Sequence, residues 1–397
     1  MSFLIYPTIK ESPFLSVLGM GGGGTGTVIG GAGPDMSEDF NQNTYYVIIP
    51  YYSSAAPGSR NRIALFNPTT GKYAADFETS TSSGKIYRFT DSIVVTAKDR
   101  GWYQHYTYNN NWAESSGSFH SNYRGDEVKI SSNRLWTVGW QTSSDLTAYI
   151  RTYSVSSSGL TNVGNYTNTS MGAYNGYYNS MIDNPVIGVQ AYVTASTGIL
   201  SSIGNLHVKA PDGNGSNAHE RRSSLVINNL NNGSFTLNNH SSNSGNYSRP
   251  IAGTGWDGYC YTSGMDGART WVTSSGSSST WSGFTCTPPS GNGNGFHGVG
   301  VLGRSGRFIT VATSGSTHYF AFVSTSGVSY QYSIPTTTGA TVQQYPNGCA
   351  TCDYDSTVNK IRVRIYNSSS GWSTMYAATE YSPTNMLNYN YRKIITY

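Results

Sequence analysis

Tyr46-Val47-Ile48-Ile49 is the first of seven short apolar runs that recur along this sequence. The later runs are Ile93-Val94-Val95, Leu135-Trp136-Thr137-Val138, Val186-Ile187-Gly188-Val189, Trp256-Asp257-Gly258-Tyr259, Phe308-Ile309-Thr310-Val311 and Cys349-Ala350-Thr351-Cys352. Counted between Val47, Val94, Trp136, Ile187, Trp256, Ile309 and Ala350, the steps are 47, 42, 51, 69, 53 and 41 residues. A period of about 40 to 50 residues is typical of the blades of a β-propeller.

Each run belongs to a unit of four predicted strands. Two further strands follow the run, as residues 62–66 and 72–77 do in the first unit. A short strand precedes the run in most units, as residues 85–89 do in the second unit. Turn residues such as Asn-Pro-Thr-Thr-Gly at 67–71 separate the strands, because Asn and Gly tolerate the positive φ that hairpins need. We therefore predict an all-β protein, a propeller of about seven four-stranded antiparallel blades that begin near residues 45, 93, 135, 186, 255, 307 and 349. A pair of two-sheet sandwiches is the alternative.

The composition agrees with an ordered β protein. Charged residues make up only 11% of the chain, against about 25% in typical soluble domains, while 37% are hydrophobic and can supply a core. The 24 basic and 20 acidic residues are scattered, so no basic block is available to follow a phosphate backbone. No stretch of about 20 apolar residues occurs. We predict neither a nucleic-acid partner nor membrane insertion.

Two units depart from the pattern. The first lacks a leading strand, so we expect residues 392–397, Arg-Lys-Ile-Ile-Thr-Tyr, to pair there and close the ring. The fourth is overlong, and its extra residues, about 194–246, are rich in Asn, Ser and Gly. We expect this polar insertion to project as a loop from one face, where partners often bind.

Residues 1–34 differ from the predicted propeller at 35–397. They contain glycine runs at 19–26 and 30–33, which predict an extended arm that does not fold alone. Large apolar side chains precede the glycines, and each gains roughly 1.5 to 3 kcal/mol on burial. We expect them to form an interface with another subunit. They are Phe3, Leu4, Ile5, Tyr6, Phe14, Leu15, Val17 and Leu18.

The arm also carries a resemblance to known proteins. Residues 9–15, Ile-Lys-Glu-Ser-Pro-Phe-Leu, lead into Leu-Gly-Met-Gly-Gly-Gly-Gly-Thr-Gly at 18–26. This segment resembles the N-termini of structural proteins from marine cyanobacterial phages. The resemblance implies a virion protein, present in multiple copies, whose arm anchors a variable β-rich body to other virion proteins of the tail or capsid.

The N-terminal segment is not expected to be a signal peptide. Pro7, Lys10, Glu11 and Pro13 interrupt its apolar stretch. We therefore predict synthesis in the host cytoplasm and a final location in the virion.

No catalytic constellation stands out. The seven histidines are dispersed, and no metal or cofactor motif surrounds them. Cys349 and Cys352 are three residues apart on a predicted strand, which puts their side chains on opposite faces, so we expect two buried small side chains rather than a metal site. Asp353 and Asp355 share one strand face, as a pair of glycosidase carboxylates could, but a turn at a blade end explains the pattern equally well.

Two further motifs are noted. Asp212, Asn214 and Ser216 repeat the alternating oxygen donors of a calcium loop, but Ser223 stands where the bidentate acid belongs, so calcium is only an alternative. Residues 264–271, Gly-Met-Asp-Gly-Ala-Arg-Thr-Trp, are similar to the Asp-box turn of sialidase-type propellers, with Gly264 and Ala268 departing from its pattern. That turn is structural, so it supports the architecture alone.

Aromatic residues are the richest binding resource, because Tyr and Trp combine an apolar face with a polar tip. The leading prediction is a non-catalytic virion structural protein whose propeller is displayed at the surface. A host-surface glycan-binding lectin is the first alternative, and a propeller glycan hydrolase is the second. The expected glycan contacts are Trp102, Tyr103, Tyr174, Tyr177 and Tyr178.

Overall fold

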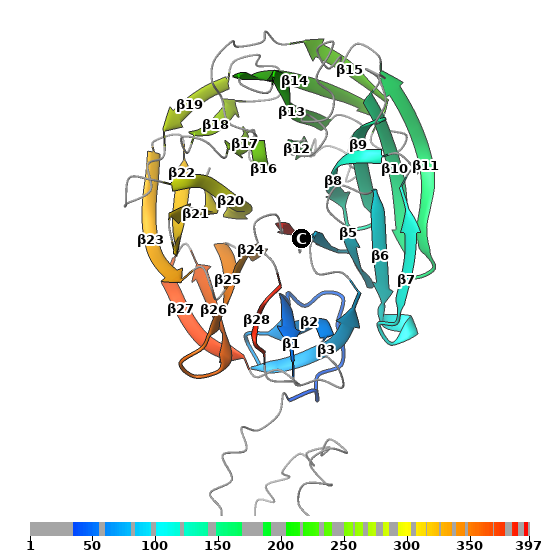
Figure 1. The fold of residues 1–397 in the computed structure, drawn as a ribbon. Helices are drawn as coiled ribbons and strands as arrows, with labels where there is room; N and C mark the ends of the chain where they lie inside the picture. Colours follow the sequence, from blue (N-terminus) through cyan, green and yellow to red (C-terminus); the bar gives the residue numbers. More distant parts are fainter. Residues whose placement is uncertain are drawn as a thin grey trace, which may run out of the picture.

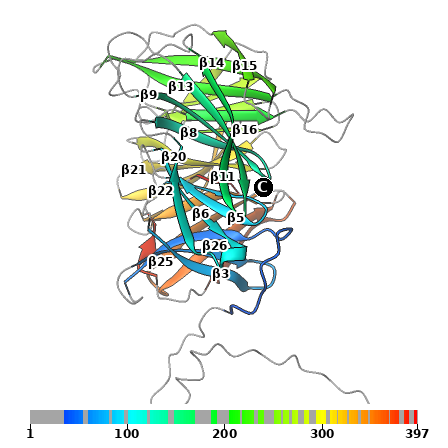
Figure 2. The same cartoon turned by 90° about the vertical axis from the view of Figure 1, so that its right-hand side faces the viewer.

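The computed structural model describes residues 35–395 apart from internal gaps, the longest of which are 169–185, 192–203 and 240–249; within 166–315 it describes the strands and their pairing. This part of the chain forms 29 strands and one short 3₁₀ helix. Within it, no helix has the length and apolarity needed to cross a membrane. The sheets stand around a common axis (Figure 1), and viewed edge-on the strands cross the narrow dimension of the ring (Figure 2). The fold is therefore a β-propeller, and the sandwich alternative is wrong.

Apart from β29, the described strands divide into seven groups of four, which we call blades 1 to 7 and list from the axis outward. Blade 1 contains β28 (Asn385–Met386), β1 (Val47–Ser53), β2 (Arg60–Asn67) and β3 (Lys72–Thr79); blade 2 contains β4 (Lys85–Arg88), β5 (Ser92–Thr96), β6 (Trp102–Thr107) and β7 (Glu114–Ser118); blade 3 contains β8 (Tyr123–Ser131), β9 (Arg134–Gln141), β10 (Ala148–Ser156) and β11 (Gly159–Asn168). Blade 4 contains β12 (Val186–Ala191), β13 (Gly204–Asn214), β14 (Asn217–Asn229) and β15 (Ser234–Asn239); blade 5 contains β16 (Pro250–Trp256), β17 (Tyr259–Gly264), β18 (Arg269–Ser274) and β19 (Trp281–Thr285). Blade 6 contains β20 (Gly293–Leu302), β21 (Arg307–Ser314), β22 (Thr317–Ser324) and β23 (Gly327–Pro335); blade 7 contains β24 (Ala340–Tyr345), β25 (Gly348–Asp355), β26 (Lys360–Asn367) and β27 (Gly371–Ala377).

Each blade hides its apolar faces against its neighbours. Both faces of β1 and β5 are buried, which explains why these strands are nearly continuous apolar runs. The outer strand β3 instead alternates between buried and partly exposed positions. Separate apolar clusters fill the spaces between blades 7 and 1, 1 and 2, 2 and 3, and 6 and 7. No blade could bury this surface alone, so the ring is the smallest stable unit.

The C-terminal segment closes the ring, but through other residues than the sequence predicted. The inner strand of blade 1 is β28, in which Met386 and Asn385 pair with Tyr51 and Tyr52. Of the expected partner, residues 392–397, the structure describes β29 (Lys393–Ile395), which does not pair with blade 1. It lies at the axis, where it pairs in parallel with β24 and with β4. It therefore joins blade 7 to blade 2 across the inner edge of blade 1.

A glutamine side chain completes the inner edge of blade 1. The Gln343 amide accepts a hydrogen bond from the Ile48 N–H at 2.8 Å and donates one to the Ile48 carbonyl at 2.9 Å. These are the bonds that a neighbouring strand would make. Because β28 is only two residues long, Gln343 of blade 7 substitutes for the missing inner strand at this level.

The predicted insertion at 194–246 is corrected. Within it, β13, β14 and β15 form the three outer strands of blade 4. The pairing of β13 with β14 extends from Gly204↔Ile227 to Asn214↔Asn217. The segment contributes a long hairpin rather than a loop.

Candidate functional site: the root of the N-terminal arm

The segment 35–46 precedes β1 and follows residues 1–34 in the sequence; we call it the arm root. Its first residue is attached to the outer strand of blade 1, since the Tyr73 N–H donates to the Asp35 carbonyl at 2.8 Å. Lys72 in the same strand reaches the Asp35 carboxylate at 3.7 Å and the Ser37 hydroxyl at 2.8 Å. The arm root therefore begins at the rim of the ring.

Glu38 ties the arm root to the hairpin between β2 and β3. Its carboxylate accepts hydrogen bonds from the Asn67 amide at 2.8 Å, the Thr70 hydroxyl at 2.6 Å and the Tyr46 hydroxyl at 3.2 Å. Three donors to one carboxylate fix its position, and hydrogen bonds to a charged group are the strong ones.

Phe40 inserts an aromatic ring between blades 1 and 2. Its ring centroid lies 5.0 Å from Trp112, 5.2 Å from Tyr108 and 5.7 Å from Tyr46. Trp112 in turn stacks on Phe77 at 5.3 Å. Trp112 has a φ of 58°, an unfavourable backbone conformation for a bulky residue, and its packing against both blades holds it there.

Arg88 of β4 clamps the same segment from blade 2. Its guanidinium donates to the carbonyls of Thr44 and Gln42 and lies 5.5 Å and 5.0 Å from the ring centroids of Phe40 and Tyr46. Burial lowers the pKa of Arg88 to about 10, so the group stays charged at neutral pH. The arm root is thus held by blades 1 and 2 together.

The groups gathered here suit anchorage better than chemistry. They are aromatic rings, backbone carbonyls, the Glu38 carboxylate with its three donors, the Asp35–Lys72 ion pair and one arginine, and none forms a nucleophile–base pair. No cluster of metal-ligating side chains occurs among the described residues. The sequence reasoning missed Phe40, Arg88 and Trp112; a signal was present in Arg88, a lone charge inside the apolar run Ile86-Tyr87-Arg88-Phe89.

The predicted interface residues 3–6, 14, 15, 17 and 18 lie outside the described residues, as do Tyr174, Tyr177 and Tyr178. Of the two described glycan candidates, Trp102 is 58% exposed, whereas Tyr103 is half-buried with its ring 4.8 Å from Phe119. Neighbours on a strand point to opposite faces, so Trp102 and Tyr103 do not form one stacking platform.

The calcium candidate falls in a hairpin. Asp212 of β13 pairs with His219 and Asn214 with Asn217, while Ser216 lies outside the described residues. The Asp-box-like segment spans the connection between β17 and β18, and its residues 265–268 are likewise outside.

The two described cysteines are buried and free, as predicted. Cys349 packs in the cluster between blades 6 and 7, and Cys352 in the one between blades 7 and 1. Burial raises the pKa of both thiols, which makes them poor nucleophiles.

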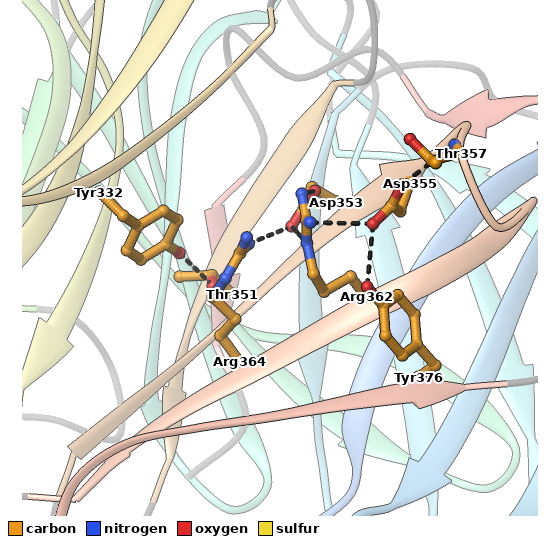
Figure 3. A network of polar contacts seen from close by, with 8 residues as sticks. All are labelled: Tyr332, Thr351, Asp353, Asp355, Thr357, Arg362, Arg364 and Tyr376. Atoms are coloured by element: carbon orange, nitrogen blue, oxygen red, sulfur yellow. Dashed lines mark hydrogen bonds and ion pairs between the residues drawn. The ribbon is translucent and has the colours of Figure 1, made fainter.

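Arginines neutralise the paired carboxylates Asp353 and Asp355 (Figure 3). Asp353 contacts both Arg362 and Arg364, and Arg362 also lies 2.9 Å from Asp355. The Tyr376 hydroxyl donates to Asp355 at 3.0 Å. The network joins the strands of blade 7, so these two acids are structural.

Comparison with known proteins bears on the fold. No protein-family model and no curated protein matches this sequence. A 6-phosphogluconolactonase-like protein from Bacteroides uniformis is similar in structure, with 11% identity and a TM-score of 0.50 over 85% of this chain and 98% of that one. The Cps50 (Swd1) β-propeller domain of Myceliophteria thermophila has 8% identity and a TM-score of 0.47 over 86% and 96%. At such identities the likeness concerns the fold alone.

Proposed function

We propose that this chain is a non-catalytic structural component of a virion, in which the arm of residues 1–34 docks on another virion protein and the propeller is displayed at the surface. The observation that carries the proposal is the anchorage of the arm root. A flexible linker without a structural role would need no such attachment. Glu38, Phe40 and Arg88 instead fix the arm root at the rim of blades 1 and 2. A load applied to the arm would pass directly into two blades.

The part of the axis between blades 7 and 2 supports a displayed body rather than an enzyme. The backbone of β29 lies there, and Ile394 and Gln343 are both fully buried. This part of the axis is occupied by the protein's own chain.

The test is incorporation into particles. Deleting residues 1–34 should leave a propeller with an unchanged melting temperature that is missing from purified particles. Replacing Phe3, Leu4 and Ile5 by Ser should have the same effect, because the apolar side chains make the contact. The matched control replaces Thr8, Ser12 and Ser16 by Ala and should incorporate normally. Normal incorporation of the deletion variant would refute anchoring by the arm.

A host-glycan lectin is the second candidate, and the exposed indole of Trp102 favours it. Trp102→Ala should then abolish binding to host envelopes or to a glycan array, while Val163→Ala, which also removes an exposed apolar side chain, should not. Hydrolysis of a bound glycan by the purified protein would contradict a non-catalytic role.

A further inference from the structure

The outer strands of a propeller present unpaired edges, and most of those described here are protected. An unprotected edge pairs readily with a strand of another chain. The edge of β3 carries Lys72, Asp76 and Glu78 and is bonded to the arm root through Asp35. A β-bulge interrupts β11 at Val163 and another interrupts β23 at Gln331. The other three outer strands are shorter than β27: β7 has five residues and includes Glu114, β15 has six residues and β19 has five.

β27 lacks all of these devices. It has seven residues, Gly-Trp-Ser-Thr-Met-Tyr-Ala, without a charge or a proline, and it pairs with β26 in unbroken register from Ile361↔Ala377 to Asn367↔Gly371. Among the described residues, no other segment bonds to its backbone. Ser373, Thr374 and Tyr376 are exposed, and the strand lies at the rim (Figure 1).

The sequence of β27 is complementary to itself. If two copies pair antiparallel with Thr374 opposite Thr374, Trp372 of each strand lies opposite Tyr376 of the other, and Ser373 lies opposite Met375. Cross-strand aromatic pairs stabilise a sheet, and the absence of charge avoids the repulsion that identical strands would otherwise suffer on a two-fold axis. A second copy of this strand therefore fits the edge.

Both aromatic side chains are already fixed in place. The Trp372 indole N–H donates to the Gln331 side-chain carbonyl at 3.2 Å, and the Tyr376 hydroxyl is held by Asp355, itself paired with Arg362 (Figure 3). Ordering these side chains before association lowers the entropy lost on binding.

We propose that two copies of this protein associate edge to edge through antiparallel pairing of their β27 strands, with Thr374 on the two-fold axis. The two blade 7 sheets then form one continuous sheet. The contact is at the rim and does not involve the arm, so this proposal stands or falls independently of the virion role.

The first test places charges on the two-fold axis. Thr374→Lys and Thr374→Glu should each weaken self-association of the full-length protein by about tenfold or more, because like charges then face each other. An equimolar mixture of the two should restore dimers that salt weakens. Thr161→Lys, at an exposed threonine of the bulged strand β11, should leave association unchanged. Sedimentation velocity measures the dimer, and the melting temperature confirms folding.

The second test reports the register. Residues directly opposite in an antiparallel pair have Cα atoms about 4.5 to 5.5 Å apart, which a disulfide can span. Thr374→Cys should therefore yield a covalent dimer under mild oxidation, and Thr161→Cys should not. A protein that is monomeric at all soluble concentrations overturns the proposal. So does a dimer that neither charge variant weakens, or one that Thr374→Cys fails to cross-link.

Discussion

Tyr51 and Tyr73 lie in the same cluster between blades 7 and 1, yet their hydroxyl groups differ in what they contact. The Tyr51 hydroxyl donates to Asp76 at 2.7 Å, and Asp76 also accepts from Arg62 at 2.8 Å. The Tyr73 hydroxyl is buried with no hydrogen-bond partner among the described residues. Burying a hydroxyl group without a hydrogen-bond partner lowers the stability of the folded state, whereas a hydrogen bond to a carboxylate offsets this loss.

This difference predicts opposite effects for one chemical change. Tyr73→Phe removes an unsatisfied hydroxyl and should raise the free energy of unfolding by about 1 kcal/mol, while Tyr51→Phe should lower it by about 1 to 3 kcal/mol. Denaturant titration of the two variants measures both values. Equal destabilisation by the two would show that the hydroxyl environments are not as described.

Lys129 of β8 is expected to make the stability of the protein depend on pH. Burial, reinforced by the charge of Arg88, lowers its pKa to about 7. In the unfolded chain the amine keeps a pKa near 10.4, so the unfolded state binds more protons between these values and stability rises with pH. From pH 7 to 9 the contribution is about 2 kcal/mol.

Lys129→Met keeps the volume and removes the titration. The wild-type protein should gain stability from pH 7 to pH 9, and the variant should be more stable at pH 7 with a flatter profile. Chemical denaturation at the two pH values measures this. A variant profile that parallels the wild type would exclude Lys129 as the titrating group.

At the scale of the element, the two C-terminal strands, β28 and β29, pair with different blades. β28 is the inner strand of blade 1, whereas β29 lies between β24 and β4. Removing residues 388–397 should lower the melting temperature by several degrees, because the axial pairing of β29 and the packing of Ile394 are lost while β28 is kept. Removing residues 384–397 also opens the ring between blades 1 and 7 and should abolish the cooperative transition. Retention of the full melting temperature by the longer truncation would contradict closure through β28.

The strands that could be predicted from the sequence are those buried on both faces, because they recur as apolar runs at regular intervals. Val47, Val94 and Trp136 mark strands buried on both faces, and such strands must be apolar wherever they occur. Asn385 and Met386 carry no such pattern, since a two-residue strand needs only its backbone, so closure was assigned to the more apolar residues 392–397. The polar composition of 194–246 likewise concealed strands, because hairpin pairing does not require apolar side chains on both faces.

The candidate site was harder to predict than the fold. Glu38, Phe40 and Arg88 come together only because blade 2 packs beside blade 1. The spacing of these residues in the sequence does not predict that contact. Trp102 and Tyr103 were both predicted as glycan contacts, but the alternation of the strand places them on opposite faces. Clustering in sequence is a poor guide to clustering on a β surface.

At the scale of the whole molecule, the ring is closed by β28, and the arm root is attached at its rim. Closure makes the seven blades one body, and the contacts of the arm root with blades 1 and 2 fix that body relative to the start of the arm. A propeller held in this way would stand beside its support and keep both faces of the ring free.

A reconstruction of the purified particle that locates this chain tests the account most directly. It should show ring-shaped density attached through the rim at blades 1 and 2, with the arm reaching a neighbouring virion protein. A ring seated on its support by a face, or particles that lack the protein altogether, would contradict the account.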